Sequence, residues 1–191
     1  LDDPLSGYGI EDITWAVQTS PGGPTVNVTG TIEDVHRYAE KVNPNYRSDF
    51  ALHRSQTTNN KGSRSSNDEG HEKDKRYEVR NYDCDWGIVQ PVSIVKVGIA
   101  RLREAPGHPV MGPGPGNCGR VMCERESAIY WCNDSTHKKG LDTFGNIADG
   151  AQLVVDTCTK SFHHLRLVAG AVFLKDEWSV QVTFSEDCQK H

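Results

Sequence analysis

Cysteine is the residue type in this chain whose number and spacing point most directly to chemistry. The six cysteines are Cys84, Cys118, Cys123, Cys132, Cys158 and Cys188. An even number within one stretch predicts three disulfides and therefore a secreted protein. A zinc site is one alternative, because Cys118 and Cys123 are spaced as ligands can be, but no second close pair of Cys or His follows at the usual distance. Free core thiols are the other alternative, and spacing alone does not choose the pairing of three bridges.

Motifs of known enzyme chemistry are missing from the sequence. There is no Gly-x-Ser-x-Gly elbow, and His71-Glu72 has no second His four residues later. The stretch "GPGPGNCG" (residues 112–119) lacks Gly-Lys-Ser/Thr, and its prolines remove amide donors, so it is not a phosphate loop. We therefore expect no catalytic residue, no metal ligand and no cofactor.

Three pairs of titratable residues are of types that can carry acid–base or metal chemistry. Glu124 and Glu126 flank an expected turn, and Asp83 and Asp85 lie two residues apart. Either pair could serve acid–base catalysis if it lined a cleft. His163-His164 could bind a metal or sense pH. Charged and His residues at turns are usually solvated, so we expect these residues to be surface turns.

Two kinds of modification are suggested by short motifs. Asn27 and Asn133 each begin an Asn-x-Ser/Thr sequon, which predicts glycosylation of a secreted protein. Lys75 and Arg76 end a long polar stretch that a protease could reach. We interpret the dibasic pair as a kexin-type processing site, with residues 1–76 as a propeptide; an ordinary charged linker is the alternative.

Residues 1–52 are expected to form a ββα unit. "ITWAVQT" (Ile13–Thr19) and "TVNVTG" (Thr25–Gly30) read as two strands around a Pro/Gly turn. Thr31 then predicts the cap of a helix that ends at Asn43-Pro44. A unit of this size without cysteines is marginal by itself, so we expect it to lean on another part of the protein.

Residues 53–76 are expected to be a disordered linker. The stretch from His53 to Arg76 contains no Ala, Val, Ile, Leu, Met, Phe, Trp, Tyr or Cys. Such a segment has no apolar side chains whose burial could offset the conformational entropy lost on ordering.

Residues 77–191 are expected to form the cysteine-containing body. Helices are predicted at 91–104 and 144–158, the second from an apolar spacing of three and four residues. Strands are predicted at 76–84, 120–124, 127–133, 165–174 and 178–184. The order β-α-β-β-α-β-β predicts an α+β fold, a two-layer sandwich of an antiparallel sheet with two helices.

Composition argues against two kinds of partner. The formal net charge is −5 and the isoelectric point is near 5.9, which argues against nucleic acid and against a polybasic contact with membranes. No stretch approaches the roughly 20 apolar residues that span a bilayer. The chain begins without Met or an apolar leader, so we expect a mature start after a removed secretion signal.

Two long stretches resemble known secreted proteins. "GPGPGNCGRVMC…SAIYWCND…FGNIADGAQLVVDTC…VAGAVF…W" (residues 112–178) resembles a family of small secreted proteins of filamentous fungi, and Ile13–Phe50 resembles their pro-region. The order of elements is similar to that of fungal killer-toxin-like α/β sandwich proteins, and the chain also resembles effectors of cereal pathogens such as the rice blast fungus. The resemblance implies a secreted virulence effector in the host apoplast. Most specifically it implies inhibition of a host papain-like cysteine protease, with a cytotoxic or necrosis-inducing role as the alternative.

A binding protein is the function class that we expect, with a host protein as partner and the propeptide able to remain bound. Prolines in the loop from Pro106 to Gly116 limit the entropy lost on binding, and its glycines allow a partner's backbone to approach. Leu167–Gly170 with Trp178 is faintly similar to cystatin hairpins. The expected contact residues are Pro106, His108, Pro109, Met111, Pro113, Pro115 and Trp178. An enzyme is the competing class, and it would need converging polar groups.

Overall fold

The computed structural model describes residues 5, 7–61, 78–105 and 107–189 of the 191-residue chain. Lys75, Arg76 and Pro106 lie outside these residues. The elements in chain order are β1 (Gly9–Glu11), β2 (Thr14–Gln18), β3 (Thr25–Thr29), α1 (Ile32–Val42), α2 (Tyr46–Lys61), β4 (Val79–Asp83), β5 (Gln90–Pro91), α3 (Val92–Glu104), β6 (Val110–Met111), β7 (Asn117–Glu124), β8 (Ser127–Asn133), β9 (Lys139–Gly140), α4 (Phe144–Cys158), β10 (Lys160–Phe162), β11 (Leu165–Val168), β12 (Gly170–Leu174), β13 (Trp178–Phe184) and the 3-10 helix η1 (Glu186–Gln189). The protein is α+β, as expected.

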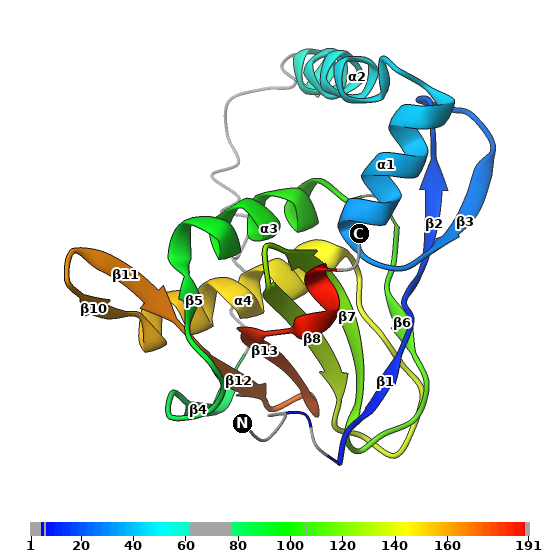
Figure 1. Cartoon of the computed structure of the whole chain (residues 1–191). Helices are drawn as coiled ribbons and strands as arrows, with labels where there is room; N and C mark the ends of the chain where they lie inside the picture. Colours follow the sequence, from blue (N-terminus) through cyan, green and yellow to red (C-terminus); the bar gives the residue numbers. More distant parts are fainter. Residues whose placement is uncertain (1–4, 6, 62–77, 106, 190–191) are drawn as a thin grey trace, which may run out of the picture.

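The centre of the protein is a six-stranded sheet in the order β1-β7-β8-β13-β12-β4 (Figure 1). Five strands pair antiparallel, but β1 pairs parallel with β7. The sheet is therefore mixed, and the expectation of an antiparallel sheet was wrong at this edge. The three-residue β1 is too short to show an alternating pattern, and its partner strand lies more than a hundred residues away. Local sequence therefore could not predict this pairing.

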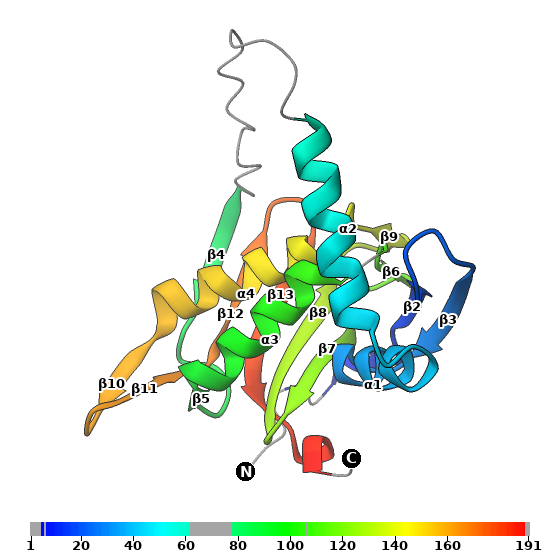
Figure 2. The same cartoon turned by 90° about the horizontal axis from the view of Figure 1, so that it is seen from above.

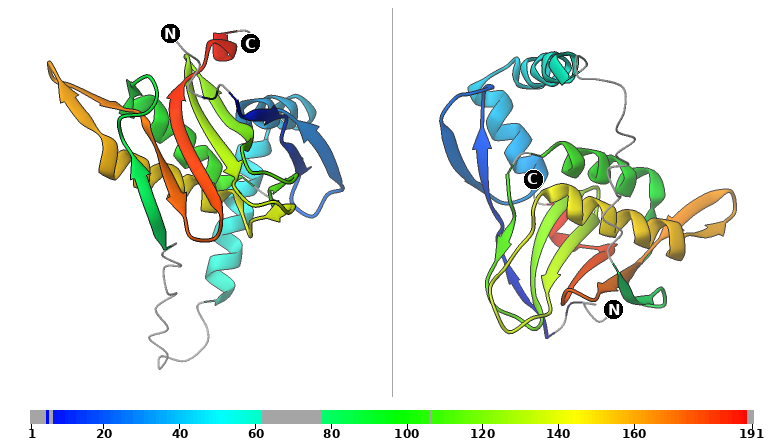
Figure 3. Two further views of the ribbon diagram at one scale, coloured as in Figure 1. Left: turned by 90° about the horizontal axis from the view of Figure 1, so that it is seen from below. Right: turned by 180° about the vertical axis from the view of Figure 1, so that it is seen from behind.

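Helices α3 and α4 lie side by side on one face of this sheet (Figures 1 and 3). Gly150 of α4 faces the Val180 side chain of β13, and a Cβ on it would come within 2.6 Å of Val180 Cγ2. Side chains of both helices and of the sheet form one buried core there. The predicted helices at 91–104 and 144–158 are confirmed, with Pro91 as the cap residue of α3.

Three disulfides join the six cysteines in the pairs Cys84–Cys158, Cys118–Cys132 and Cys123–Cys188. The prediction of disulfides is confirmed, and no cysteine is free. Cys118 and Cys132 lie directly opposite each other on β7 and β8. The last two bridges belong to a smaller core on the other face of the sheet, together with Leu5 and Tyr130.

The N-terminal elements continue the core of the body. The β2–β3 hairpin and α1 form where the sequence predicted them, and the α1 cap is a Thr31–Asp34 capping box. A further helix, α2, extends to Lys61 and into the range that was expected to lack structure (Figure 2). The rest of that range, residues 62–76, lies outside the described residues.

A short second sheet, in the order β10-β11-β5, projects from the body (Figures 1 and 2). The single strand predicted over 165–174 is in fact two strands, β11 and β12, in two different sheets. Gly170 stands at the change of sheet with φ of 145°, and a Cβ there would come within 2.6 Å of the Asp83 carbonyl oxygen. Local alternation could not reveal this break, because it depends on a distant backbone contact.

Candidate functional site

The Pro/Gly loop that was expected to bind a partner is fastened to the body at several points. Its Val110–Met111 segment pairs with β9, and Met111 is only 1% exposed. The Gly112 carbonyl accepts a 2.7 Å hydrogen bond from the Asn133 amide, and the Gly114 N–H donates one of 2.7 Å to the Ser135 carbonyl. Met111 is therefore a core residue and cannot contact a partner in this structure.

The remaining expected contact residues are placed unevenly. His108, Pro113 and Pro115 are exposed, whereas Pro109 is buried. Trp178 is 1% exposed and belongs to the main core. Trp178 directly follows a tight turn in the sequence, so we expected it at an exposed hairpin tip. In the structure its ring faces the core.

One member of each carboxylate pair is held in an ion pair. Glu124 forms an ion pair with Arg101, and Asp85 lies 3.4 Å from the Lys160 ammonium. A cleft of about 720 Å³ next to Trp178 holds further charges, but Lys175 and Glu78 pair there at 2.5 Å. Within the described residues, no group of three or more His, Cys, Asp or Glu could hold a metal ion.

The two sequons differ in their accessibility. Asn27 is exposed on β3. Asn133 is fully buried, and its amide donates 2.7 Å hydrogen bonds to the carbonyls of Gly112 and His137. A glycan on Asn133 is incompatible with this structure, so the expectation for that residue was wrong.

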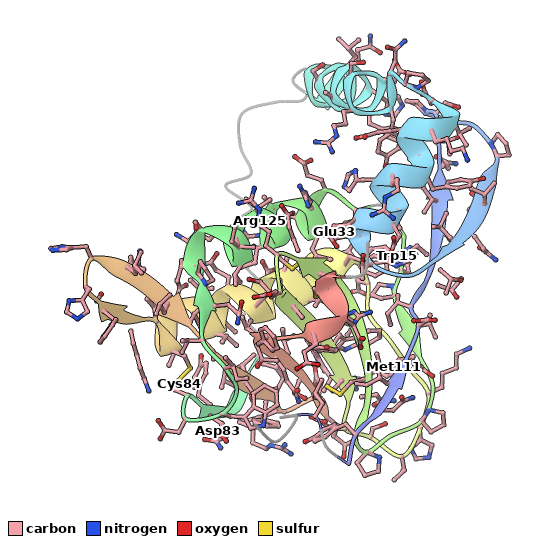
Figure 4. The ribbon with its side chains drawn as sticks, in the orientation of Figure 1. Trp15, Glu33, Asp83, Cys84, Met111 and Arg125 are labelled. Atoms are coloured by element: carbon pink, nitrogen blue, oxygen red, sulfur yellow. A yellow bond between two sulfur atoms is a disulfide. The ribbon has the colours of Figure 1, made fainter. Side chains whose placement is uncertain are left out.

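A half-buried ion-pair cluster joins α1 to the body, and sequence analysis missed it. Glu33 Oε2 accepts a 2.9 Å hydrogen bond from the Cys123 N–H, and Glu33 Oε1 lies 3.3 Å from Arg101. Burial raises the pKa of Glu33, although the Cys123 N–H and the charge of Arg101 act in the opposite direction. Figure 4 shows Glu33 and Trp15 at the junction of the N-terminal elements with the body.

His36 lies in a cleft of about 340 Å³ at the same junction, where α1, α2 and α3 meet. Both of its ring nitrogens are buried without a hydrogen-bond partner among the described residues. Burial lowers the pKa of His36, and the charges of Arg47 and Arg101 lower it further against those of Glu40 and Glu104. His36 is therefore held in its neutral form near neutral pH.

The most exposed apolar side chains of the body lie at the tip of the β10–β11 hairpin, which we call the arm. Phe162 and Leu165 are 63% and 59% exposed, and they are directly opposite each other in the pairing. Opposed residues share one face of a ladder, as do residues two apart. Leu167 and Pro91 continue this face across β11 and β5. This face is apolar except for Lys160, which lies opposite Leu167, and it ends in the Phe162 ring.

The turn of the arm is His163-His164, which confirms that this pair forms a surface turn. Their φ angles are 43° and 67°, the left-handed values that a two-residue type I′ turn requires at both positions. Such a conformation costs on the order of 1 kcal/mol for each residue without a glycine. The Arg125-Glu126 turn between β7 and β8 shares this conformation, so it marks tight hairpins in this protein and is not by itself a sign of binding.

The base of the arm is braced covalently. Cys158 ends α4 two residues before β10, and it is joined to Cys84, which follows β4 (Figure 4). Val168 and Gln90, on the opposite face of the arm sheet, are buried against the body. The arm therefore combines an exposed apolar tip with a fixed base. The apolar residues flanking a polar His-His pair were the sequence signal for it.

Among the described residues, no helix has both the length and the apolar character needed to cross a lipid bilayer. Comparisons of the chain with known protein families, with curated proteins and with solved structures found no match.

Proposed function

We propose that this protein is a secreted fungal virulence effector that acts by binding a host protein, and that the arm makes the contact. The observation that carries the proposal is the pair Phe162 and Leu165, exposed at the tip of a hairpin with a fixed base. Aromatic side chains at the centre of a contact can supply much of the energy of binding, and neighbouring contacts such as Leu165 exclude water around them. A fixed base also limits the entropy lost when the tip is immobilised.

Secretion and processing belong to the same proposal. Three disulfides suit an oxidising, extracellular location, here the host apoplast. The position of α3 and α4 on one face of the sheet supports a killer-toxin-like two-layer sandwich for residues 77–191. Residues 1–76 would then be a propeptide that is cut after Lys75 and Arg76.

The specific partner that we propose is a papain-like cysteine protease of the host apoplast, with inhibition as the outcome. A narrow hairpin with an apolar tip has a suitable shape to enter the cleft of such an enzyme. This choice rests on the resemblance to fungal effectors, and the arm is the surface through which it can be tested.

The test is a titration of the purified full chain into a plant papain-like protease that is hydrolysing a fluorogenic peptide. We expect inhibition at micromolar concentration or below. The paired change Phe162→Ser and Leu165→Ser should weaken inhibition by about tenfold or more, because hot-spot side chains contribute roughly 1–2 kcal/mol each or more. The control is Leu52→Ser on α2, which removes an equally exposed side chain (60%) away from the arm. A protease that stays fully active at micromolar protein would refute the proposal.

A further inference from the structure

We infer that residues 5–61 stay bound to residues 78–189 as a permanent subunit when the chain between them is cut. The working protein then consists of two polypeptides, and the N-terminal part is a structural component that is not discarded. The inference rests on the proposed processing, because that processing is what would cut the chain in the host. The contacts that carry it, however, are those of the intact chain.

Apolar contacts make the N-terminal segment part of the main core. The Trp15 ring stacks on the Phe144 ring of α4, with centroids 3.7 Å apart and planes 10° apart, and neither ring is exposed. Ile13 fills the space over Gly119 of β7, where a Cβ would come within 2.1 Å of the Ile13 Cδ1 atom. Removing the segment would therefore open the core beside β7 and α4 to water.

Backbone pairing fastens the segment at the edge of the central sheet. The β1 residues from Gly9 to Glu11 pair parallel with Asn117 to Gly119. Glu11 Oε1 also accepts a 2.9 Å hydrogen bond from the Gly112 N–H. Without β1, the β7 edge would present unpaired backbone groups, which is a site for pairing with other chains.

Polar contacts are satisfied across the same junction. Glu33 accepts the Cys123 N–H, and it shares Arg101 with Glu124 of the body. The side chains of Glu33, Arg101 and Glu124 are 14–28% exposed. Removing the partner of such a largely covered hydrogen-bonding group lowers stability. The body surface is thus complementary to this one segment in shape, backbone pairing and charge.

No disulfide crosses the junction, because all three lie between Cys84 and Cys188. After a cut, only these noncovalent contacts would hold the two polypeptides together. The N-terminal elements and the arm lie at opposite ends of the molecule (Figures 1 and 2). A retained subunit would therefore leave the arm uncovered.

The test uses the full chain with a thrombin recognition sequence placed within residues 62–76. After cleavage, electrophoresis in detergent without reductant should show two bands. Size exclusion with light scattering at neutral pH should show one particle of unchanged mass. Two particles in the native measurement would overturn the inference.

A matched pair of variants shows whether the named contacts hold the complex. Glu33→Ala should raise the dissociation constant of the cut protein by roughly 10- to 100-fold, because the Cys123 N–H and Arg101 both lose their partner at the junction. Glu40→Ala on the same helix, whose partner Arg47 is exposed, should change it less than about threefold. Equal effects of the two variants would contradict the assigned junction. Because the experiment supplies its own cut, a chain that is never processed in its host would refute the proposed processing alone.

Discussion

The replacement of Trp15 by Ala tests whether the N-terminal elements and the body unfold as one unit. The Trp15 side chain is fully buried, its ring stacks on Phe144, and its Nε1–H donates a 2.8 Å hydrogen bond to the Gly30 carbonyl. Trp→Ala changes in a core cost about 3–5 kcal/mol. For a chain of this length, each kcal/mol lowers the melting temperature by about 2–4 °C.

We therefore expect Trp15→Ala to lower the melting temperature by on the order of 10 °C. Differential scanning calorimetry should show one transition in the wild type and one, shifted, in the variant. Val42→Ala is the control, because Val42 ends α1 in the same segment and is 54% exposed. Its effect should stay within about 0.5 kcal/mol, as for other surface changes.

Two transitions, of which only the smaller shifts in Trp15→Ala, would contradict a single unfolding unit. That outcome would mean that the N-terminal elements fold as a separate pro-unit and merely touch the body. A single transition that does not move would instead contradict the buried position of Trp15.

Three further predictions concern pH, glycosylation and the arm. Because the folded protein holds His36 with a pKa below its usual 6.5, the unfolded chain binds more protons, and the free energy of unfolding should fall as pH drops below about 6.5. Urea unfolding at pH 7.5 and 5.5 should show a smaller fall in the free energy of unfolding for His36→Gln than for the wild type. The raised pKa of Glu33 favours the folded state as pH drops and is present in both proteins, so it does not explain a difference between them. An equal fall would contradict the role assigned to His36. Peptide mass spectrometry of protein from a glycosylating host should find a glycan on Asn27 and none on Asn133, and a modified Asn133 in folded protein would show its burial to be wrong. Replacing His163 and His164 by Asn and Gly should stabilise the protein by roughly 1–2 kcal/mol in urea unfolding, since the left-handed turn loses its strain; an unchanged or lower stability would argue against that turn geometry.

The elements of the body were predictable where burial follows a local pattern. Apolar residues recur every three or four positions along α4, and those on this spacing, from Phe144 to Cys158, are buried. The capping box at Thr31 likewise specifies the start of α1. These signals involve residues within one or two turns of each other, so they can be recognised without knowing the rest of the fold.

The candidate site was predicted poorly because exposure is not a local property. Met111 and Trp178 are large apolar residues beside turns, which is equally typical of a contact surface and of a core. Asn133 has a valid sequon but lies at the end of a strand whose residues are all buried. Phe162 and Leu165 flank a His-His turn, which is a sequence signal for a hairpin tip, but their exposure follows only from the projection of the arm from the body.

Hydrophobic period and cysteine number predicted an α+β protein with three disulfides, because these signals depend on local geometry and redox chemistry. The pairing of the cysteines, the parallel position of β1 and the place of Trp15 in the core of the body followed from the folded structure alone. All three have one cause. A pairing is a relation between residues far apart along the chain, and its free energy exists only once the chain has brought them together.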